Sequence, residues 1–141
     1  GDFFTIEDLQ EVVDKINEQE ADLVLFTGDL MDNAANYDGA IDEIAIVLSK
    51  VKSKFGKYAV FGNRDYGGGA VKEYANIMAE SDFSLLRNEN QVFTLDNGKK
   101  ILFTGLDDAL LGNPQFPSPN QMAETSYDIL LTHEPDEVSQ Y

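Results

Sequence analysis

The chain contains no cysteine and no tryptophan, only one histidine, and no long hydrophobic run. Without cysteine it has no disulfides, no thiolate metal site and no thiol nucleophile. No apolar run approaches the roughly 20 residues of a membrane-spanning helix, and no signal peptide is visible. Basic residues are scarce, with 10 Lys and Arg against 26 Asp and Glu, a net charge of −16. A nucleic-acid partner is therefore not expected, because phosphate backbones are held by clustered basic side chains.

The rest of the composition is that of an ordinary globular domain. The 141 residues are 43% hydrophobic, which is enough for one domain over residues 1–141 with a buried core. No repeat, low-complexity stretch or linker divides the sequence. We therefore expect an acidic globular domain, or a piece of one.

Hydrophobic spacing predicts helices that alternate with short buried strands. Thr5 precedes a helical apolar spacing and is followed three residues later by an acid, which indicates an N-cap. Nearly all-apolar runs over 22–27 and 58–61, each stopped by a glycine, are typical of parallel strands covered on both faces. Two more helices are expected near residues 41–48 and 70–80.

The spacing of hydrophobic residues changes in the second half of the chain. Residues 91–95 and 100–104 flank an Asn-Gly pair and predict a β-hairpin. A final apolar run over 127–132 leads directly to His133. The fold class expected from these patterns is α/β, built of βαβ units with an antiparallel hairpin in the second half.

Polar side chains follow three of the predicted strands at the point where each strand ends. Asp29 follows the first, Asn63, Arg64 and Asp65 follow the second, and His133 follows the last. Each has an ordinary interpretation alone, as a turn aspartate, a surface ion pair or an isolated histidine. Ligands of open α/β sheets gather at the carboxyl ends of the strands, and carboxylate, amide and imidazole groups all bind divalent metals. Together the three loops predict a metal site.

Three segments carry a family resemblance, and they occur in a fixed order. Gly28-Asp29-x-x-Asp32, Gly62-Asn63-Arg64-Asp65 and Leu131-Thr132-His133-Glu134-Pro135 resemble the motifs of the calcineurin-like metallophosphoesterases. The Gly-Leu-Asp-Asp segment at 105–108 also resembles one that is common in bacterial members. The resemblance covers essentially the whole chain, and it implies part of that family's four-layer α/β/β/α sandwich.

The resemblance also implies roles for individual residues. Asp29 would bridge two divalent ions (Mn, Fe or Zn), while Asn63 and His133 would bind one of them. The implied reaction is hydrolysis of a phosphomonoester or phosphodiester by a hydroxide that the two ions activate. Arg64 and Asp65 would belong to the catalytic loop, with Arg64 where the family usually has a histidine. Because arginine stays protonated, it would neutralise charge on the phosphate or leaving oxygen, with Asp65 holding it in place.

The two end motifs of the family are not found in this sequence. The D-x-H motif does not precede the first predicted helix, and the G-H-x-H motif does not follow His133. We therefore expect the middle of a larger catalytic domain, truncated at both ends. It would bind at most one ion weakly and have impaired activity. An open sheet edge would permit self-association.

Two alternatives from other classes stay open. A noncatalytic binding or regulatory domain could retain the fold, and both Arg64 and the absent end motifs favour it mildly. An acidic calcium module over 29–38 lacks the alternate spacing and closing glutamate of an EF-hand. The expected partner is a phosphorylated small molecule or lipid, with Tyr37, Tyr66 and Phe116 as candidate substrate-facing aromatics. The compartment stays open between the cytoplasm and a membrane anchor upstream of Gly1.

Overall fold

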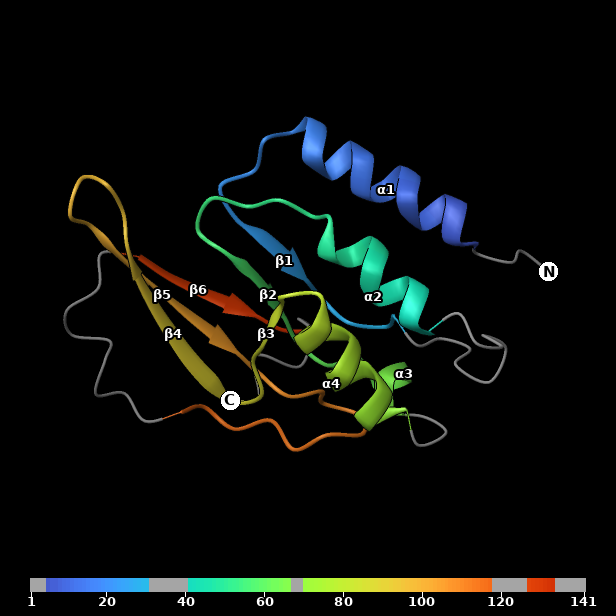
Figure 1. The fold of residues 1–141 in the computed structure, drawn as a ribbon. Coiled ribbons are helices and arrows are strands. Elements are labelled where there is room, and N and C mark those ends of the chain that lie inside the picture. The colour runs from blue at the N-terminus through green and yellow to red at the C-terminus, as the bar shows by residue number, and fades with distance from the viewer. Residues whose placement is uncertain (1–4, 31–40, 67–69, 118–126, 134–141) are drawn as a thin grey trace.

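The computed structural model describes residues 5–30, 41–66, 70–117 and 127–133. Within them, helices and strands alternate as the sequence predicts (Figure 1). The elements in chain order are α1 (Ile6–Glu18), β1 (Val24–Phe26), α2 (Ile41–Ser49), β2 (Lys57–Ala59), α3 (Asn63–Tyr66), α4 (Val71–Glu80), β3 (Ser84–Leu85), β4 (Glu89–Thr94), β5 (Lys100–Gly105) and β6 (Tyr127–Leu131). The four-residue helix α3 and the two-residue strand β3 are additions to the predicted elements.

The first helix begins at the predicted residue. The Thr5 hydroxyl accepts a hydrogen bond from the Asp8 N–H at 3.1 Å, and Asp8 Oδ2 accepts one from the Thr5 N–H at 2.9 Å. This reciprocal capping box satisfies two N–H groups that the helix itself leaves without acceptors.

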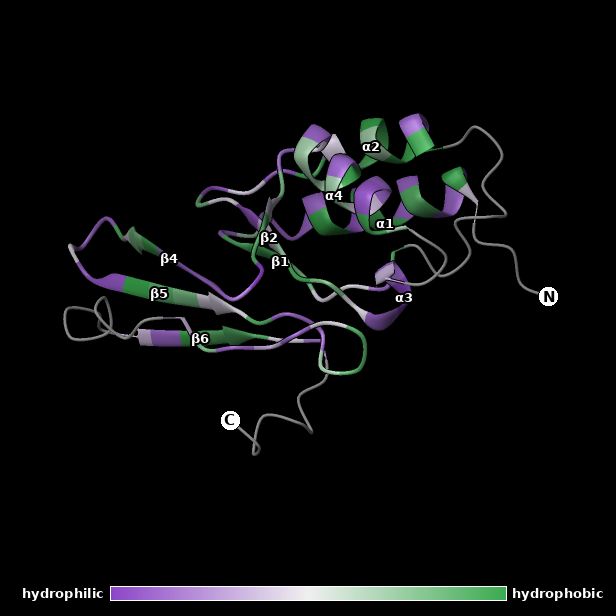
Figure 2. Ribbon diagram, turned by 90° about the horizontal axis from the view of Figure 1, so that it is seen from below, coloured by the Kyte–Doolittle hydropathy of each residue, from purple (hydrophilic) through white to green (hydrophobic). Residues whose placement is uncertain are grey.

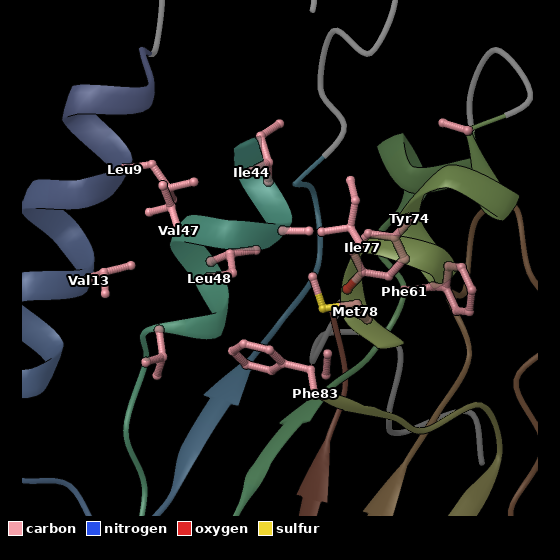
Figure 3. Packing of buried hydrophobic residues seen from close by; sticks show 14 residues of the cluster. Leu9, Val13, Ile44, Val47, Leu48, Phe61, Tyr74, Ile77, Met78 and Phe83 are labelled. Atoms are coloured by element: carbon pink, nitrogen blue, oxygen red, sulfur yellow. The ribbon is translucent and has the colours of Figure 1, made fainter. Parts of the chain in front are cut away.

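The first sheet is parallel, in the order β1-β2-β3. Helices α1, α2 and α4 lie together on one of its faces (Figure 2). Between helices and sheet lies a hydrophobic core in which Val13, Tyr74 and Met78 are fully buried (Figure 3). Removing these apolar side chains from water is the main favourable contribution to folding. It fixes the carboxyl ends of β1 and β2 on one edge of the molecule.

A second, mixed sheet packs on the other face, in the order β4-β5-β6 (Figures 1 and 2). The predicted hairpin is confirmed, since β4 and β5 pair antiparallel, while β6 runs parallel to β5. A second core between the sheets contains Tyr58 and Phe103, whose rings stack with centroids 5.3 Å apart. Helix layer, sheet and sheet follow one another as in the arrangement that the resemblance implied, and the mixed α/β class is confirmed.

None of the helices in the described ranges is long and apolar enough to cross a membrane.

Candidate metal centre

The carboxyl ends of β1, β2 and β6 meet where the two sheets adjoin (Figure 1). Asp29 lies three residues after β1, Asn63 opens α3 just beyond β2, and His133 lies two residues after β6. The contact that joins the sheets here is between His133 Nδ1 and the Thr27 carbonyl oxygen, 2.6 Å apart. The structure thus brings together the three side chains that the sequence singled out as metal ligands.

His133 is oriented so that one ring nitrogen faces the other two residues. A carbonyl oxygen only accepts, so Nδ1 carries the proton that it donates to Thr27, and neutral imidazole then has its lone pair on Nε2. Nε2 lies 3.2 Å from Asn63 Oδ1 and 3.3 Å from Asp29 Oδ2. A nitrogen lone pair that faces two oxygen acceptors is stabilised by a cation, and this second-shell bond through Nδ1 is typical of metal-binding histidines.

The distances between these atoms fit a shared cation. Ligand atoms about 2.1 Å from one ion lie roughly 3.0 Å apart in an octahedron and roughly 3.4 Å apart in a tetrahedron. The two observed separations, 3.2 and 3.3 Å, fall between those values. In the described parts of the chain no group of three or more His, Cys, Asp and Glu forms a metal cluster, so the third donor of this set is the Asn63 amide. Asp32 and Glu134 of the sequence motifs lie outside the described residues.

Asp65 holds the first two loops together. Its carboxylate is fully buried, and Oδ2 accepts hydrogen bonds from the backbone N–H groups of Asp29 and Gly62, each at 2.8 Å. Asp29 has a positive φ of 65°, a conformation that costs a non-glycine residue energy and needs support from its surroundings. These bonds give Asp65 a positioning role between the loops, while its predicted catalytic role stays a prediction.

Arg64 faces the same carboxylate from the solvent side. Its backbone N–H donates to Asp29 Oδ1 at 3.1 Å, and its Nε lies 3.9 Å from Asp29 Oδ2. The Arg64 side chain is more than half exposed. The guanidinium is therefore beside the candidate centre and accessible to an anion from solvent.

Two glycines allow the first two loops to approach each other. A Cβ atom on Gly28, which has a φ of 98°, would overlap the backbone nitrogen of Gly62. A Cβ atom on Gly62 would overlap Asp29 Oδ1. The glycines that end the two strands in the sequence therefore permit contact between the loops.

The sequence did not predict a cluster of buried polar groups behind α3. Asp107 is buried, and it accepts hydrogen bonds from the Tyr66 hydroxyl, from Arg87 Nε at 3.0 Å and from the Asn113 N–H at 2.9 Å. Burial by itself would raise the pKa of Asp107, but the hydrogen bonds from Tyr66, Asn113 and Arg87 outweigh it and lower the pKa. The cluster fixes the end of the helix that Asn63 begins.

The same cluster explains one of the candidate aromatics. Burial, and next the hydrogen bond to Asp107, raise the pKa of Tyr66, whose ring packs on Phe61 with centroids 4.9 Å apart. Tyr66 thus packs locally. Phe116 lines a small pocket of about 120 Å³ on the mixed sheet, together with residues of β4, β5 and β6. Tyr37 lies outside the described residues. The acid pair in the Gly-Leu-Asp-Asp segment was the one signal that pointed to the Asp107 cluster.

Comparison with known proteins identifies the family of this chain. Residues 2–141 match the calcineurin-like phosphoesterase family, and the chain belongs to that family. Its members are metal-dependent phosphoester hydrolases. The match over residues 2–141 confirms the family that the motifs resembled.

Individual relatives are similar over nearly the whole chain. The Bacillus subtilis metallophosphoesterase YkuE is 39% identical over 137 residues, which cover 96% of this chain and 48% of YkuE. YkoQ from the same organism is 29% identical over 138 residues, covering 90% of this chain and 47% of YkoQ. A Danio rerio transmembrane protein with a metallophosphoesterase domain is 26% identical over 142 residues, which cover 94% of this chain and 32% of that protein. The chain thus spans half or less of the length of these relatives.

Proposed function

We propose that this chain contributes a divalent-cation site to a phosphoester hydrolase, with Asp29, Asn63 and His133 as the ligands. The observation that carries this is the orientation of His133, whose Nε2 faces an oxygen of Asn63 and an oxygen of Asp29 at 3.2 and 3.3 Å. The family membership supports it, because phosphoesterases of this family use divalent metals. The proposed ion is Mn, Fe or Zn, since the donor set mixes carboxylate, amide and imidazole.

The residues around the site have separable tasks in this proposal. A divalent cation, when bound, supplies Lewis-acid activation of the phosphate and of the attacking water. Thr27 holds the Nδ1 proton of His133 and so keeps Nε2 directed at the centre. Arg64 stays protonated and stabilises negative charge on the phosphate or on the leaving oxygen, a role that does not require it to donate a proton. The substrate is a phosphomonoester or phosphodiester.

Metal binding tests the proposal directly. Titration calorimetry with Mn²⁺ on the wild-type chain is expected to give at most one site. Asp29→Asn and His133→Ala are each expected to weaken binding at least tenfold, because the first replaces a charged carboxylate by a neutral amide and the second removes the imidazole donor. Asp22→Asn is the matched control, since Asp22 lies exposed just before the opposite end of β1. Equal Mn²⁺ affinity in all four proteins would contradict the assignment of the ligands.

A turnover assay separates the hydrolase from a noncatalytic binding domain. The exposed arginine at position 64, beside the candidate ligands, is the observation that favours the second candidate. Hydrolysis of bis(p-nitrophenyl) phosphate with Mn²⁺ is expected to be slow in this chain and to fall further in Arg64→Ala. Metal binding without turnover, with phosphate affinity that depends on Arg64, would instead support the binding domain.

A further inference from the structure

The loop after β5 exposes two leucines in succession. Leu110 is 64% and Leu111 is 58% exposed, and with Ala109 they form what we call the apolar turn, residues 109–111. Neither leucine belongs to the two hydrophobic cores among the described residues. Their apolar surface therefore adds little to folding and is available for a contact from outside.

The apolar turn is nevertheless held in a defined conformation. Asp108 Oδ2 accepts hydrogen bonds from the N–H groups of Leu110 and Leu111 at 3.1 and 2.7 Å, and the Asp108 carbonyl accepts one from Gly112 at 3.1 Å. Asp107 and Asp108 are both 1% exposed. Burying two adjacent carboxylates is costly without such bonds. These hydrogen bonds hold the backbone of the apolar turn in one conformation.

The residues just before the apolar turn connect its loop to two elements of the candidate centre. The Leu106 N–H donates to the Leu131 carbonyl at 3.0 Å, and Leu131 lies two residues before His133. The next residue, Asp107, accepts a hydrogen bond from the Tyr66 hydroxyl at the end of α3, the helix that begins with Asn63. In both views the loop runs beside α3, and Figure 2 shows its hydrophobic stretch close to that helix. The turn therefore lies a few residues after contacts that join its loop to α3 and to the end of β6, the elements that carry Asn63 and His133.

We propose that the apolar turn is a specificity-determining element that contacts an apolar organic group of the phosphoester. This inference rests on the proposed function, which places the phosphate at Asp29, Asn63, His133 and Arg64. An alkyl or aryl group attached to that phosphate would cover Leu110 and Leu111 and remove apolar surface from water. The contact is independent of charge, and so is not opposed by the net charge of −16. Phosphoesters with a short or strongly polar group lack this contribution.

Two non-hydrolysable phosphonates measure the contact without any turnover. In the presence of Mn²⁺, titration calorimetry is expected to show hexylphosphonate binding at least tenfold more tightly than methylphosphonate. The double variant Leu110→Ser/Leu111→Ser is expected to lose about tenfold in hexylphosphonate affinity, as covering about 50 Å² of apolar surface predicts. Its affinity for methylphosphonate stays unchanged. Ile46→Ser is the matched control, because Ile46 is 59% exposed but lies on α2.

The possible results separate this inference from the proposed function. Methylphosphonate that binds with Mn²⁺, together with a hexyl preference that the double variant retains, would overturn the role of the turn and leave the centre intact. Methylphosphonate that fails to bind any of the proteins would overturn both. Binding of the wild-type chain to phosphatidylcholine vesicles without Mn²⁺, abolished in the double variant, would assign the turn to a membrane surface and likewise overturn the proposal.

Discussion

Asp65 and Asp107 are the two buried carboxylates on which the geometry of the centre depends. Asp65 Oδ2 accepts from two backbone N–H groups, and Asp107 accepts from the Tyr66 and Arg87 side chains and from the backbone N–H groups of Asp108 and Asn113. A buried carboxylate is tolerated when its oxygens accept several hydrogen bonds, and removing the charge then leaves donors unsatisfied. Each residue therefore stabilises the native arrangement of the loops that it joins.

The lowered pKa of Asp107 predicts how stability depends on pH. Its pKa is lower in the folded protein than the value of about 3.9 expected when unfolded, so the ionised form stabilises the fold above that value. We expect Asp107→Asn to lower the unfolding free energy by about 2–3 kcal/mol at pH 7. The difference in unfolding free energy between wild type and Asp107→Asn should shrink as the pH falls from about 4 through the lower pKa that Asp107 has in the folded protein.

Urea unfolding of both proteins between pH 7 and pH 3 measures this difference. Asp96→Asn serves as the control, since Asp96 makes an exposed ion pair with Lys54 whose loss should matter little at any pH. A gap between wild type and Asp107→Asn that stays constant down to pH 3 would show that the Asp107 charge does not stabilise the fold.

The candidate ligands could be predicted from the sequence because each follows an apolar run within a few residues. The rule that parallel strands end at one edge of a sheet predicts that Asp29 and Asn63 meet. His133 follows a strand of the second sheet, and its role as a ligand beside them was implied by the family resemblance. The Asp107 cluster followed no such rule. Tyr66, Arg87 and Asn113 come from three separate segments, and the acid pair at 107–108 did not indicate that these side chains meet around a buried carboxylate.

At the scale of elements, the loop that follows β1 and the start of α3 act as one unit. Gly28 and Gly62 bring the two backbones into contact, and Asp65 bonds both of them. The position of Asn63 relative to Asp29 thus depends on how closely two chain segments approach, and not only on the helix itself. Substitutions that separate the loops should affect the centre more than substitutions that merely strain one turn.

A pair of glycine variants tests this. Gly28→Ala introduces both a positive-φ alanine and an overlap with Gly62, whereas Gly98→Ala introduces a positive-φ alanine with no atom within 4 Å of the new Cβ. We expect Gly98→Ala to cost about 1 kcal/mol of stability and Gly28→Ala at least about 3 kcal/mol. Gly28→Ala should also lose Mn²⁺ binding. Thermal unfolding and Mn²⁺ titration check both expectations, and equal costs for the two variants would contradict them.

Most elements could be predicted because their hydrophobic periods are clear. The capping box at Thr5, the helices near 41–48 and 70–80 and the hairpin after residue 90 all carry local signals, and the structure confirms them. α3 and β3 are too short to show a period. The pairing of β6 with β5 was also beyond prediction, because an apolar run suits either sheet and the partner is chosen by the core between them.

At the scale of the whole molecule, the net negative charge destabilises the folded state. A net charge of −16 on 141 residues places like charges closer together in the compact state than in the unfolded chain. Asp29, the carboxylate of the candidate centre, lies within this strongly acidic protein. A bound divalent cation would therefore relieve repulsion locally, while dissolved salt would relieve it everywhere.

Salt should consequently stabilise the wild-type chain. Raising tetramethylammonium chloride, which does not ligate carboxylates, from about 10 to 300 mM shortens the Debye length from about 30 to about 6 Å. We expect the thermal midpoint to rise by roughly 2–5 °C, equivalent to about 1 kcal/mol. Adding Mn²⁺ at constant ionic strength should give a further rise in the wild type but not in His133→Ala. A midpoint that is flat or falls with the monovalent salt would show that the folded state is not limited by its own charge.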